Sequence, residues 1–217
     1  MSTITIFGAT GYAGGHIAAI AAERGHDVVA VSRHATREAV PDATEVRSLS
    51  IHDSAQVAGL IADSDVVVIA LKASAEDDEG RRLIDALPHV LESAAAAGTR
   101  IGVVGGAGSL HESADGPLLM DTADFPAAVL PESRAHKDVL DLLRTDSRGA
   151  SWFYVSPAQL FGAHFPGERT GHYRLGDDVL VRDEAGRSAI SGADLAIAIV
   201  DEIDSPRHHD VRFTVGY

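Results

Sequence analysis

The sequence has 217 residues, of which 45% are hydrophobic and 23% charged, so it can form one large core and has an ordinary globular composition. Its formal net charge of −14 disfavours broad contact with nucleic acid, and its lack of cysteine excludes disulfides, thiolate metal ligands and a cysteine nucleophile. No apolar run is long enough to cross a membrane and no charged-then-apolar leader is present, so we expect a cytoplasmic protein that makes no membrane contact.

The first thirty-odd residues carry the most informative pattern. A β-branched run at 4–7 is followed by Gly8, Gly11 and Gly14, an amphipathic helix, and a second strand at 28–31. At a dinucleotide site Gly8 permits a sharp turn, Gly11 lets backbone approach a pyrophosphate, and Gly14 lets the helix pack closely. Free N–H groups at the start of the helix would face the phosphates. The alternative is a strand-to-helix turn that binds nothing.

The end of the second strand indicates which nicotinamide cofactor is preferred. It reads Ser32-Arg33-His34, where an acidic residue usually binds the ribose 2′-hydroxyl of NAD(H). Arg33 and Ser32 can instead hold a 2′-phosphate by charge and hydrogen bonds, so the sequence favours NADP(H) over NAD(H). The alternative is that Arg33 is a solvated surface charge, or stacks on adenine without selecting between the two cofactors.

The rest of the chain continues the alternation of strands and helices. An unbroken apolar run at 65–71 is typical of a strand covered on both faces of a parallel sheet. Pro88 is expected to break or kink the helix that contains it, because proline removes a backbone donor. Gly98 is expected to end that helix, and Ser191 to begin the last one with a capping box. Further strands are expected at about 45–50, 100–104, 151–156 and 212–215, and helices at about 54–62, 78–97 and 132–144.

Two stretches of the sequence resemble a known family. The segment 7–14 (FGATGYAG), with 24–28 and 32–33 after it, and the string GGAGSL at 105–110 resemble the atypical short-chain dehydrogenases with an NAD(P)H-binding domain. That family includes NmrA-like proteins and bacterial proteins named as candidate NADH-flavin reductases. The resemblance runs nearly end to end and implies a doubly wound Rossmann-type fold that binds NAD(P)H. It implies no particular substrate, because members include reductases, redox sensors and proteins without known activity.

The cofactor contacts are expected at the carboxyl ends of the strands, where open α/β sheets bind ligands. In the family the third strand commonly ends in an Asp near the adenine. Ser50 matches that position here, which leaves the contact to backbone around Ile51. Lys72 either faces a phosphate or ribose, or is simply solvated. The candidate cofactor-binding residues are Gly8, Thr10, Gly11, Tyr12, Ala13, Gly14, Ser32, Arg33, His34, Ile51, Leu71, Lys72, Gly105, Gly106 and Pro157.

The candidate catalytic residues are His136, Lys137 and Ser109. Ordinary short-chain dehydrogenases use Tyr-x-x-x-Lys on one helix face, with the Lys assisting the Tyr as an acid. Here Ser133 stands four residues before Lys137, and a serine hydroxyl is a poor general acid. Proton transfer then falls to water or to His136, which is equally interpretable as a helix-surface residue without a role. Gly106 takes the place of the serine that often orients the substrate, so Ser109 is only a nearby substitute.

The acceptor is expected to meet residues 158–190, a substrate-side insertion after Pro157. An aromatic and basic loop beside a hydride donor suits a planar, anionic acceptor such as a flavin phosphate or a quinone-like molecule. Ordinary loop packing is the alternative. A β-hairpin is expected over 177–190. The histidines lack metal-ligand spacing, so no metal site is expected. The loop residues concerned are Phe161, His164, Phe165, Arg169, His172, Tyr173 and Arg174.

The expected architecture is a single α/β domain over residues 1–217, a doubly wound Rossmann-type parallel sheet with a small C-terminal substrate-side subdomain. The strand order is expected to be 3-2-1-4-5-6 with a seventh strand. One function that fits is an NAD(P)H-dependent oxidoreductase that passes hydride to a flavin, a quinone or a similar small conjugated acceptor. The other is a non-catalytic NADP(H)-binding redox sensor. A nucleotide-sugar epimerase fits less well, because such enzymes usually use the tyrosine. The sequence does not indicate an oligomeric state.

Overall fold

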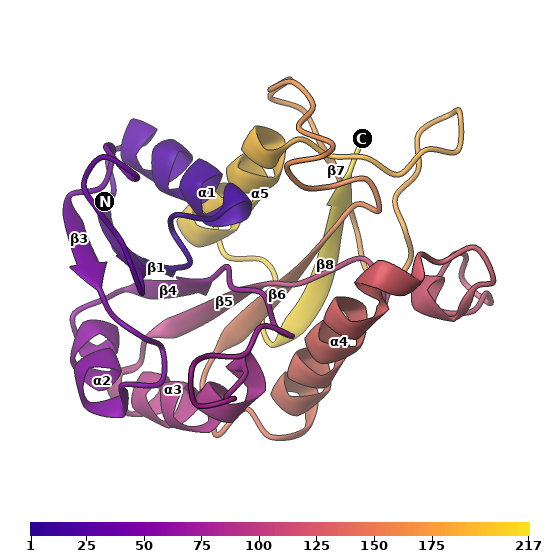
Figure 1. Ribbon diagram of the computed structural model, residues 1–217. Helices are drawn as coiled ribbons and strands as arrows, with labels where there is room; N and C mark the ends of the chain where they lie inside the picture. Colours follow the sequence, from indigo (N-terminus) through magenta and orange to yellow (C-terminus); the bar gives the residue numbers. More distant parts are fainter.

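The computed structural model describes all 217 residues, which form a central sheet with helices on both faces (Figure 1). Helices connect most of the parallel strands, because each parallel strand needs a crossover connection before the next, but the second and third strands are joined by a segment without a helix. In chain order the elements are β1 (Thr3–Phe7), α1 (Tyr12–Glu23), β2 (Asp27–Ser32), β3 (Glu45–Ser48), α2 (Ser54–Ala62), β4 (Val66–Ile69), α3 (Leu83–Ala97), β5 (Arg100–Val104), the short 3-10 helices η1 (Leu119–Asp121) and η2 (Ala127–Val129), α4 (Leu130–Thr145), β6 (Trp152–Pro157), β7 (Arg174–Gly176), α5 (Gly192–Asp204) and β8 (Val211–Gly216).

The eight strands form one sheet in the order β3-β2-β1-β4-β5-β6-β8-β7. β1 lies inside it, where Ile4 is in register with Val28 of β2 on one side and with Val66 of β4 on the other. All neighbouring strands are parallel except β7, which runs antiparallel to β8 at the edge. The expected order 3-2-1-4-5-6 is therefore confirmed, and two strands rather than one follow β6.

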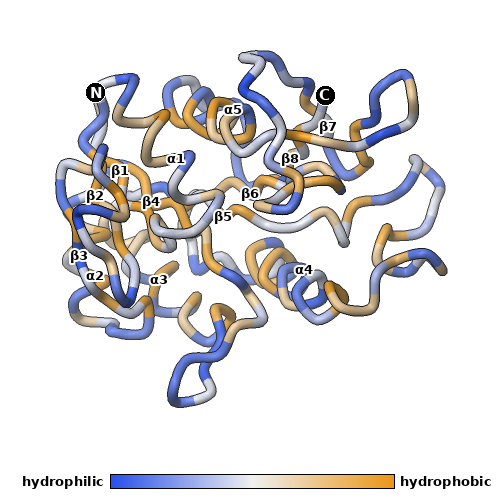
Figure 2. Tube along the Cα trace, turned by 45° about the horizontal axis from the view of Figure 1, so that its top comes forward, coloured by the Kyte–Doolittle hydropathy of each residue, from blue (hydrophilic) through white to orange (hydrophobic).

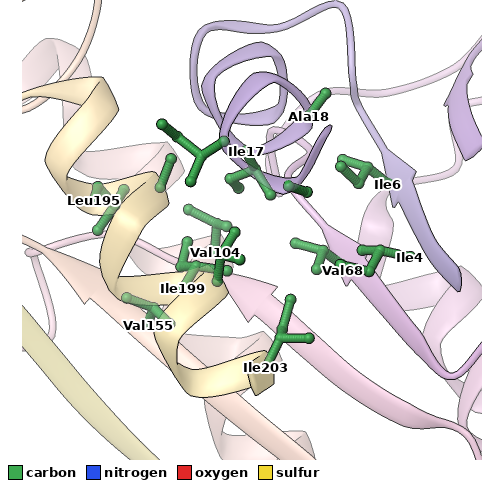
Figure 3. Packing of buried hydrophobic residues seen from close by; sticks show 14 of the residues in the cluster. Ile4, Ile6, Ile17, Ala18, Val68, Val104, Val155, Leu195, Ile199 and Ile203 are labelled. Atoms are coloured by element: carbon green, nitrogen blue, oxygen red, sulfur yellow. The ribbon is translucent and has the colours of Figure 1, made fainter. Parts of the chain in front are cut away.

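Buried side chains alternate between the two faces of the sheet. In β4, Val66 and Val68 belong to the core layer under α1 and α5, whereas Val67 and Ile69 belong to the layer under α2, α3 and α4. In the first layer Ile199 of α5 packs over the strands together with side chains of α1 (Figure 3). A strand buried on both faces must be apolar throughout, which explains the unbroken run in β4. Each large aliphatic side chain buried in this way contributes about 1.5–3 kcal/mol.

Two helix ends have the local structure that the sequence predicts. The Ser191 hydroxyl accepts a hydrogen bond from the Asp194 backbone N–H at 3.0 Å and caps α5. Gly98 ends α3 with a φ of +73°, a left-handed conformation that glycine adopts without steric cost. Both helix ends depend on neighbouring residues, so the sequence alone predicts them.

Pro88 does not break its helix, which corrects one of the two outcomes expected from the sequence, a break or a kink. α3 begins at Leu83, later than expected, and continues through Pro88 to Ala97. The proline removes one backbone hydrogen bond, but Leu87 and Leu91 beside it are completely buried against the sheet. Burial of that apolar face outweighs the lost bond.

The β-hairpin expected over 177–190 is also absent. A tight turn is present, with the Gly186 N–H bonded to the Asp183 carbonyl at 2.9 Å, but its two arms do not form strands with each other. Instead Val179 forms an isolated bridge with His111, and Ala189 forms one with Leu160. The segments on either side of the turn therefore pair with other parts of the chain.

The hydropathy pattern follows the layers. Hydrophobic segments gather in the strands and on the helix sides that face them, and the peripheral loops are hydrophilic (Figure 2). No helix of the protein combines the length and the apolar character needed to cross a bilayer.

Candidate active site

A cavity of about 340 Å³ opens at the carboxyl ends of β1, β2 and β4. Its walls are the glycine turn after β1, the end of β2, the loop after β3 and the loop after β4. Such a crevice is where doubly wound sheets bind their ligands. The sequence-based cofactor candidates that line it are Gly8, Thr10, Gly11, Ser32, Arg33, His34, Ile51, Leu71 and Lys72.

The turn between β1 and α1 has the geometry of a phosphate-binding loop. Gly8 has a φ of +85°, and a Cβ atom there would lie 2.4 Å from the Ala70 carbonyl oxygen. A Cβ on Gly14 would lie 2.2 Å from the Gly8 carbonyl oxygen, so α1 packs directly on the turn. No side chain caps the first turn of α1, whose N–H groups remain available to an anion. The residues at this turn therefore fit a bound pyrophosphate.

Two positive side chains at the cavity are free of protein partners. Arg33, after β2, and Lys72, after β4, are both exposed and make no hydrogen bond or ion pair through their side chains. Arg81, which also lines the cavity, is different because its guanidinium lies 2.8 Å from Asp77 and 3.0 Å from Glu79. The hydrogen bond from Arg81 holds the pKa of Asp77 at about 2. Arg33 and Lys72 are thus the cations available to an anionic ligand.

The wall at which the adenine is expected agrees only in part with the prediction from sequence. Ile51 lies at the cavity, but its carbonyl oxygen is already 2.9 Å from Nε2 of His89. Asp53, three residues after the expected acidic position, caps α2 by accepting a hydrogen bond from the Gln56 N–H at 3.2 Å. The Asp53 carboxylate is therefore engaged in capping α2.

The end of β5 forms a second, glycine-lined edge, away from the cavity. A Cβ on Gly105 would lie 2.0 Å from the Tyr154 hydroxyl, which fills the space beneath the strand end. That hydroxyl donates to the His136 carbonyl at 3.0 Å, and complete burial raises the pKa of Tyr154. A Cβ on Gly106 would lie 3.8 Å from Cδ2 of His136, so the imidazole lies beside this edge.

His136 has a charged partner that sequence analysis missed. Its Nε2 lies 3.0 Å from Oε1 of Glu132, one helical turn earlier in α4, and its Nδ1 is buried without a partner. Burial acts to raise the pKa of Glu132, but hydrogen bonds from His136 and Ser74 lower it to about 2. The spacing Glu-x-x-x-His, which places both side chains on one helix face, was the available signal.

The other two candidate catalytic residues are directed elsewhere. Lys137 pairs with Asp141 on α4. Ser109 is buried, and its hydroxyl accepts a hydrogen bond from Arg212 of β8 at 2.8 Å. Ser133, which holds the place of the usual tyrosine, packs against Gly108, where a Cβ would be 2.5 Å from its side chain. Of the three candidates, only His136 lies beside the β5 edge.

The insertion loop does not present the basic surface expected from its sequence. Arg169 is paired with Glu23 of α1 at 2.7 Å, and Arg174 donates to the Arg182 carbonyl at 2.6 Å. Both cations are therefore used to hold the loop in place. The remaining candidate residues of the loop are exposed or half-buried, namely Phe161, His164, Phe165, His172 and Tyr173.

Six cofactor candidates do not line the cavity, namely Gly105 and Gly106 at the β5 edge and four others, Tyr12, Ala13, Gly14 and Pro157. The Tyr12 side chain points away from the cavity toward the insertion, where its hydroxyl donates to the Pro166 carbonyl at 3.0 Å. Ala13 is half-buried in α1, Gly14 is buried against the turn, and Pro157 is buried at the end of β6. Contacts from these residues to a cofactor would involve backbone or the far end of the ligand. No cluster of three or more metal-ligating side chains occurs in the protein.

The fold, the glycine turn and the cavity define a Rossmann-type protein with a nucleotide-binding crevice. Residues 8–206 match the model of a family described as NAD(P)H-binding, and the chain belongs to this family of atypical short-chain dehydrogenases. The resemblance stated from sequence is thereby confirmed, as is a site for a nicotinamide cofactor.

Relatives cover the chain almost completely. It is 39% identical over 223 residues to the uncharacterised protein YwnB of Bacillus subtilis, which spans 98% of this chain and 97% of the relative. A candidate NADH-flavin reductase of Streptococcus pneumoniae has 31% identity and a TM-score of 0.84, with 100% of this chain and 99% of that chain covered. A candidate epimerase of Bacteroides thetaiotaomicron has 32% identity and a TM-score of 0.82, with 99% and 96% covered.

Proposed function

We propose that this protein is an NADPH-preferring oxidoreductase that passes hydride to a flavin, a quinone or a similar small conjugated acceptor. The observation that carries the proposal is the pair of unpartnered cations, Arg33 and Lys72, that line the same cavity as the glycine turn. In a chain of net charge −14, two free cations beside an uncapped helix N-terminus favour a ligand with several phosphates. The similarity to a candidate NADH-flavin reductase supports the reductase class.

Each part of the cavity has a distinct task in this proposal. The N–H groups of the glycine turn and of the first turn of α1 hold the pyrophosphate. Arg33, with the Ser32 hydroxyl, holds the 2′-phosphate, and a charged hydrogen bond of this kind contributes about 1.5–3 kcal/mol. Lys72 faces the phosphates or ribose from the loop after β4. Beyond the cavity, at the end of β5, the lack of a side chain at Gly106 leaves room for the nicotinamide end.

The bound cofactor supplies the hydride, and the protein supplies binding and orientation. His136 is the ionisable side chain beside Gly106 and is our candidate source of the proton that the reduced acceptor takes up, with water as the alternative. Lys137 and Ser109 keep no part in this scheme, because their side chains are held by Asp141 and Arg212.

The test is steady-state oxidation of NADPH and NADH with FMN and menadione as acceptors, alongside direct titration of both cofactors by nicotinamide fluorescence. We expect NADPH to bind at least about tenfold more tightly than NADH, which corresponds to about 1.4 kcal/mol. Turnover should exceed the rate of the same mixture without protein. Equal or tighter binding of NADH would contradict the preference, and failure to bind either cofactor would contradict the proposal.

A second candidate function is a non-catalytic NADP(H) sensor. Ser133 packs on Gly108, and Lys137 is paired with Asp141, so the helix face that carries acid catalysis in ordinary short-chain dehydrogenases is not assembled for it here. Tight NADPH binding without turnover on any acceptor of the panel would favour the sensor.

A further inference from the structure

The Glu132 carboxylate joins two segments that are far apart in the chain. It projects from the first turn of α4 and accepts hydrogen bonds from the backbone N–H groups of Ala73 and Ser74, at 2.8 and 3.0 Å, and from the Ser74 hydroxyl. Both oxygens of the Glu132 carboxylate therefore accept hydrogen bonds from the loop after β4. Only 30% of the Glu132 side chain is exposed, so most of its surface is shielded from water.

The residues beside these bonds belong to the proposed cofactor site. Ala73 directly follows Lys72, the free cation of the cavity, and Leu71 also lines the cavity. Fixing the backbone at 73–74 therefore fixes the direction from which the Lys72 side chain reaches the ligand. The same Oε1 lies 3.0 Å from Nε2 of His136, so one carboxylate also holds the imidazole beside Gly106.

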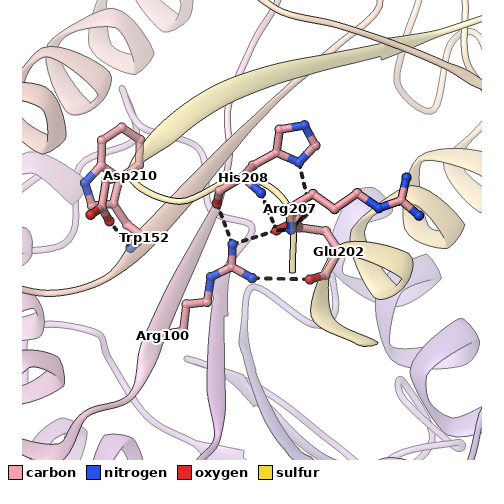
Figure 4. Close-up of polar contacts among 6 residues, drawn as sticks. All are labelled: Arg100, Trp152, Glu202, Arg207, His208 and Asp210. Carbon is pink, nitrogen blue, oxygen red and sulfur yellow. Dashed lines mark hydrogen bonds and ion pairs between the residues drawn. The ribbon is translucent and has the colours of Figure 1, made fainter. Parts of the chain in front are cut away.

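Glu202 makes a closely similar set of contacts elsewhere in the fold (Figure 4). Its carboxylate accepts from the backbone N–H groups of Arg207 and His208 at 3.0 and 3.1 Å, and it lies 2.7 Å from Nδ1 of His208. Arg100 completes the group at 2.6 Å. This carboxylate fastens the end of α5 to the segment before β8, and none of its partners lines the cofactor cavity. At Glu202 the same arrangement therefore connects two segments without contact with the cofactor cavity.

We propose that Glu132 is a positioning residue of the oxidoreductase, which holds the loop carrying Lys72 and the His136 imidazole in the arrangement that cofactor binding and hydride transfer need. The inference rests on the proposed function, because it assigns a role within the same site. A glutamine could not replace the carboxylate. Each carboxylate oxygen accepts from a backbone N–H, Oε1 from Ala73 and Oε2 from Ser74, so an amide nitrogen at either position would point an N–H at an N–H.

The experiment compares Glu132→Gln with Glu202→Gln as the matched control. For each variant the measurements are the Kd of NADPH by nicotinamide fluorescence, kcat with FMN, and the melting temperature of the protein without ligand. We expect Glu132→Gln to raise the Kd about tenfold and to lower kcat as well. Glu202→Gln is expected to lower the melting temperature at least as much, with the Kd and kcat unchanged. A change of Kd and kcat in Glu132→Gln alone distinguishes a positioning role from a general effect on stability.

Several outcomes would overturn the inference. A Glu132→Gln protein with the wild-type Kd and kcat would do so, as would equal losses of binding in both variants. If Glu132→Gln does not fold, Ser74→Ala removes only the hydroxyl donor and is expected to raise the Kd by roughly twofold or more; an unchanged Kd overturns the proposal. Wild-type protein that fails to bind NADPH overturns the proposed function and this role with it, whereas wild-type binding with an unaffected variant overturns only the role of Glu132.

Discussion

The Tyr12 hydroxyl, at the first residue of α1, donates a hydrogen bond to the Pro166 carbonyl in the substrate-side insertion at 3.0 Å. The same oxygen accepts from the Gly192 N–H, at the start of α5, at 3.1 Å. The Tyr12 ring also packs edge-on against Phe161, with ring centres 5.4 Å apart. One side chain therefore connects the glycine turn after β1 with the loop expected to meet the acceptor.

The Tyr12→Phe variant tests this connection. It keeps the ring and loses both hydrogen bonds of the hydroxyl, which we expect to reduce the free energy of unfolding by about 1–2 kcal/mol, measured by urea denaturation. The KM for FMN should rise while the Kd of NADPH stays within about twofold of wild type. Tyr173→Phe is the control, because it also loses a hydroxyl contact of the insertion, to Asp201, but lies away from the turn. Equal KM changes in both variants would argue against the connection.

Arg33→Ala tests the choice between the two cofactors. Removal of this unpaired charge should weaken NADPH binding about tenfold and leave NADH binding nearly unchanged, because only NADPH carries the 2′-phosphate. Lys72→Ala should weaken both cofactors. Arg81→Ala is the control within the same cavity, since that guanidinium is already paired with Asp77 and Glu79. Titration by nicotinamide fluorescence measures all three, and an equal loss of NADPH and NADH in Arg33→Ala would contradict the 2′-phosphate assignment.

Gly8→Ala and Gly25→Ala separate backbone strain from steric overlap. Both glycines have positive φ, at +85° and +81°, so alanine at either position should cost about 1–2 kcal/mol. At Gly25 the new Cβ meets nothing within 4 Å, whereas at Gly8 it would lie 2.4 Å from the Ala70 carbonyl oxygen. Urea denaturation should therefore show a clearly larger loss for Gly8→Ala, and NADPH binding should fail only in that variant. Similar losses in the two variants would contradict the close approach at Gly8.

The low pKa of Glu132 predicts a pH-dependent part of the stability. The pKa falls from an ordinary 4.5 to about 2 in the folded protein. The folded state therefore binds fewer protons, and the stabilisation is fully present above pH 4.5 and lost as the pH falls toward 2. The difference in unfolding free energy between wild type and Glu132→Gln should shrink over this range, measured by urea denaturation at several pH values. A difference that stays constant down to the lowest pH would show that the carboxylate charge contributes nothing.

Much of the fold was predictable because its signals are local. The glycine turn, the apolar run of β4, the Ser191 cap and the Gly98 helix end depend on residues within a few positions of one another. The strand order followed from these elements together with the family resemblance. Predictions failed where a local preference competed with tertiary contacts, as at Pro88, where the buried face of α3 outweighs one missing hydrogen bond.

The doubly wound sheet and a glycine turn that suits an anion are encoded locally, since strand, glycine spacing and helix follow one another in the sequence. Which charges remain free depends on contacts between distant parts of the chain. Arg33 and Arg169 look alike in sequence, but Arg169 is neutralised by Glu23, more than a hundred residues away, and Arg33 has no partner. The spacing of Glu132 and His136 is visible in the sequence, but the bonds from Glu132 to residues 73–74 are not, because those donors come from another part of the chain. Such pairings depend on how the loops meet at the ends of the strands, and short-range patterns do not encode that.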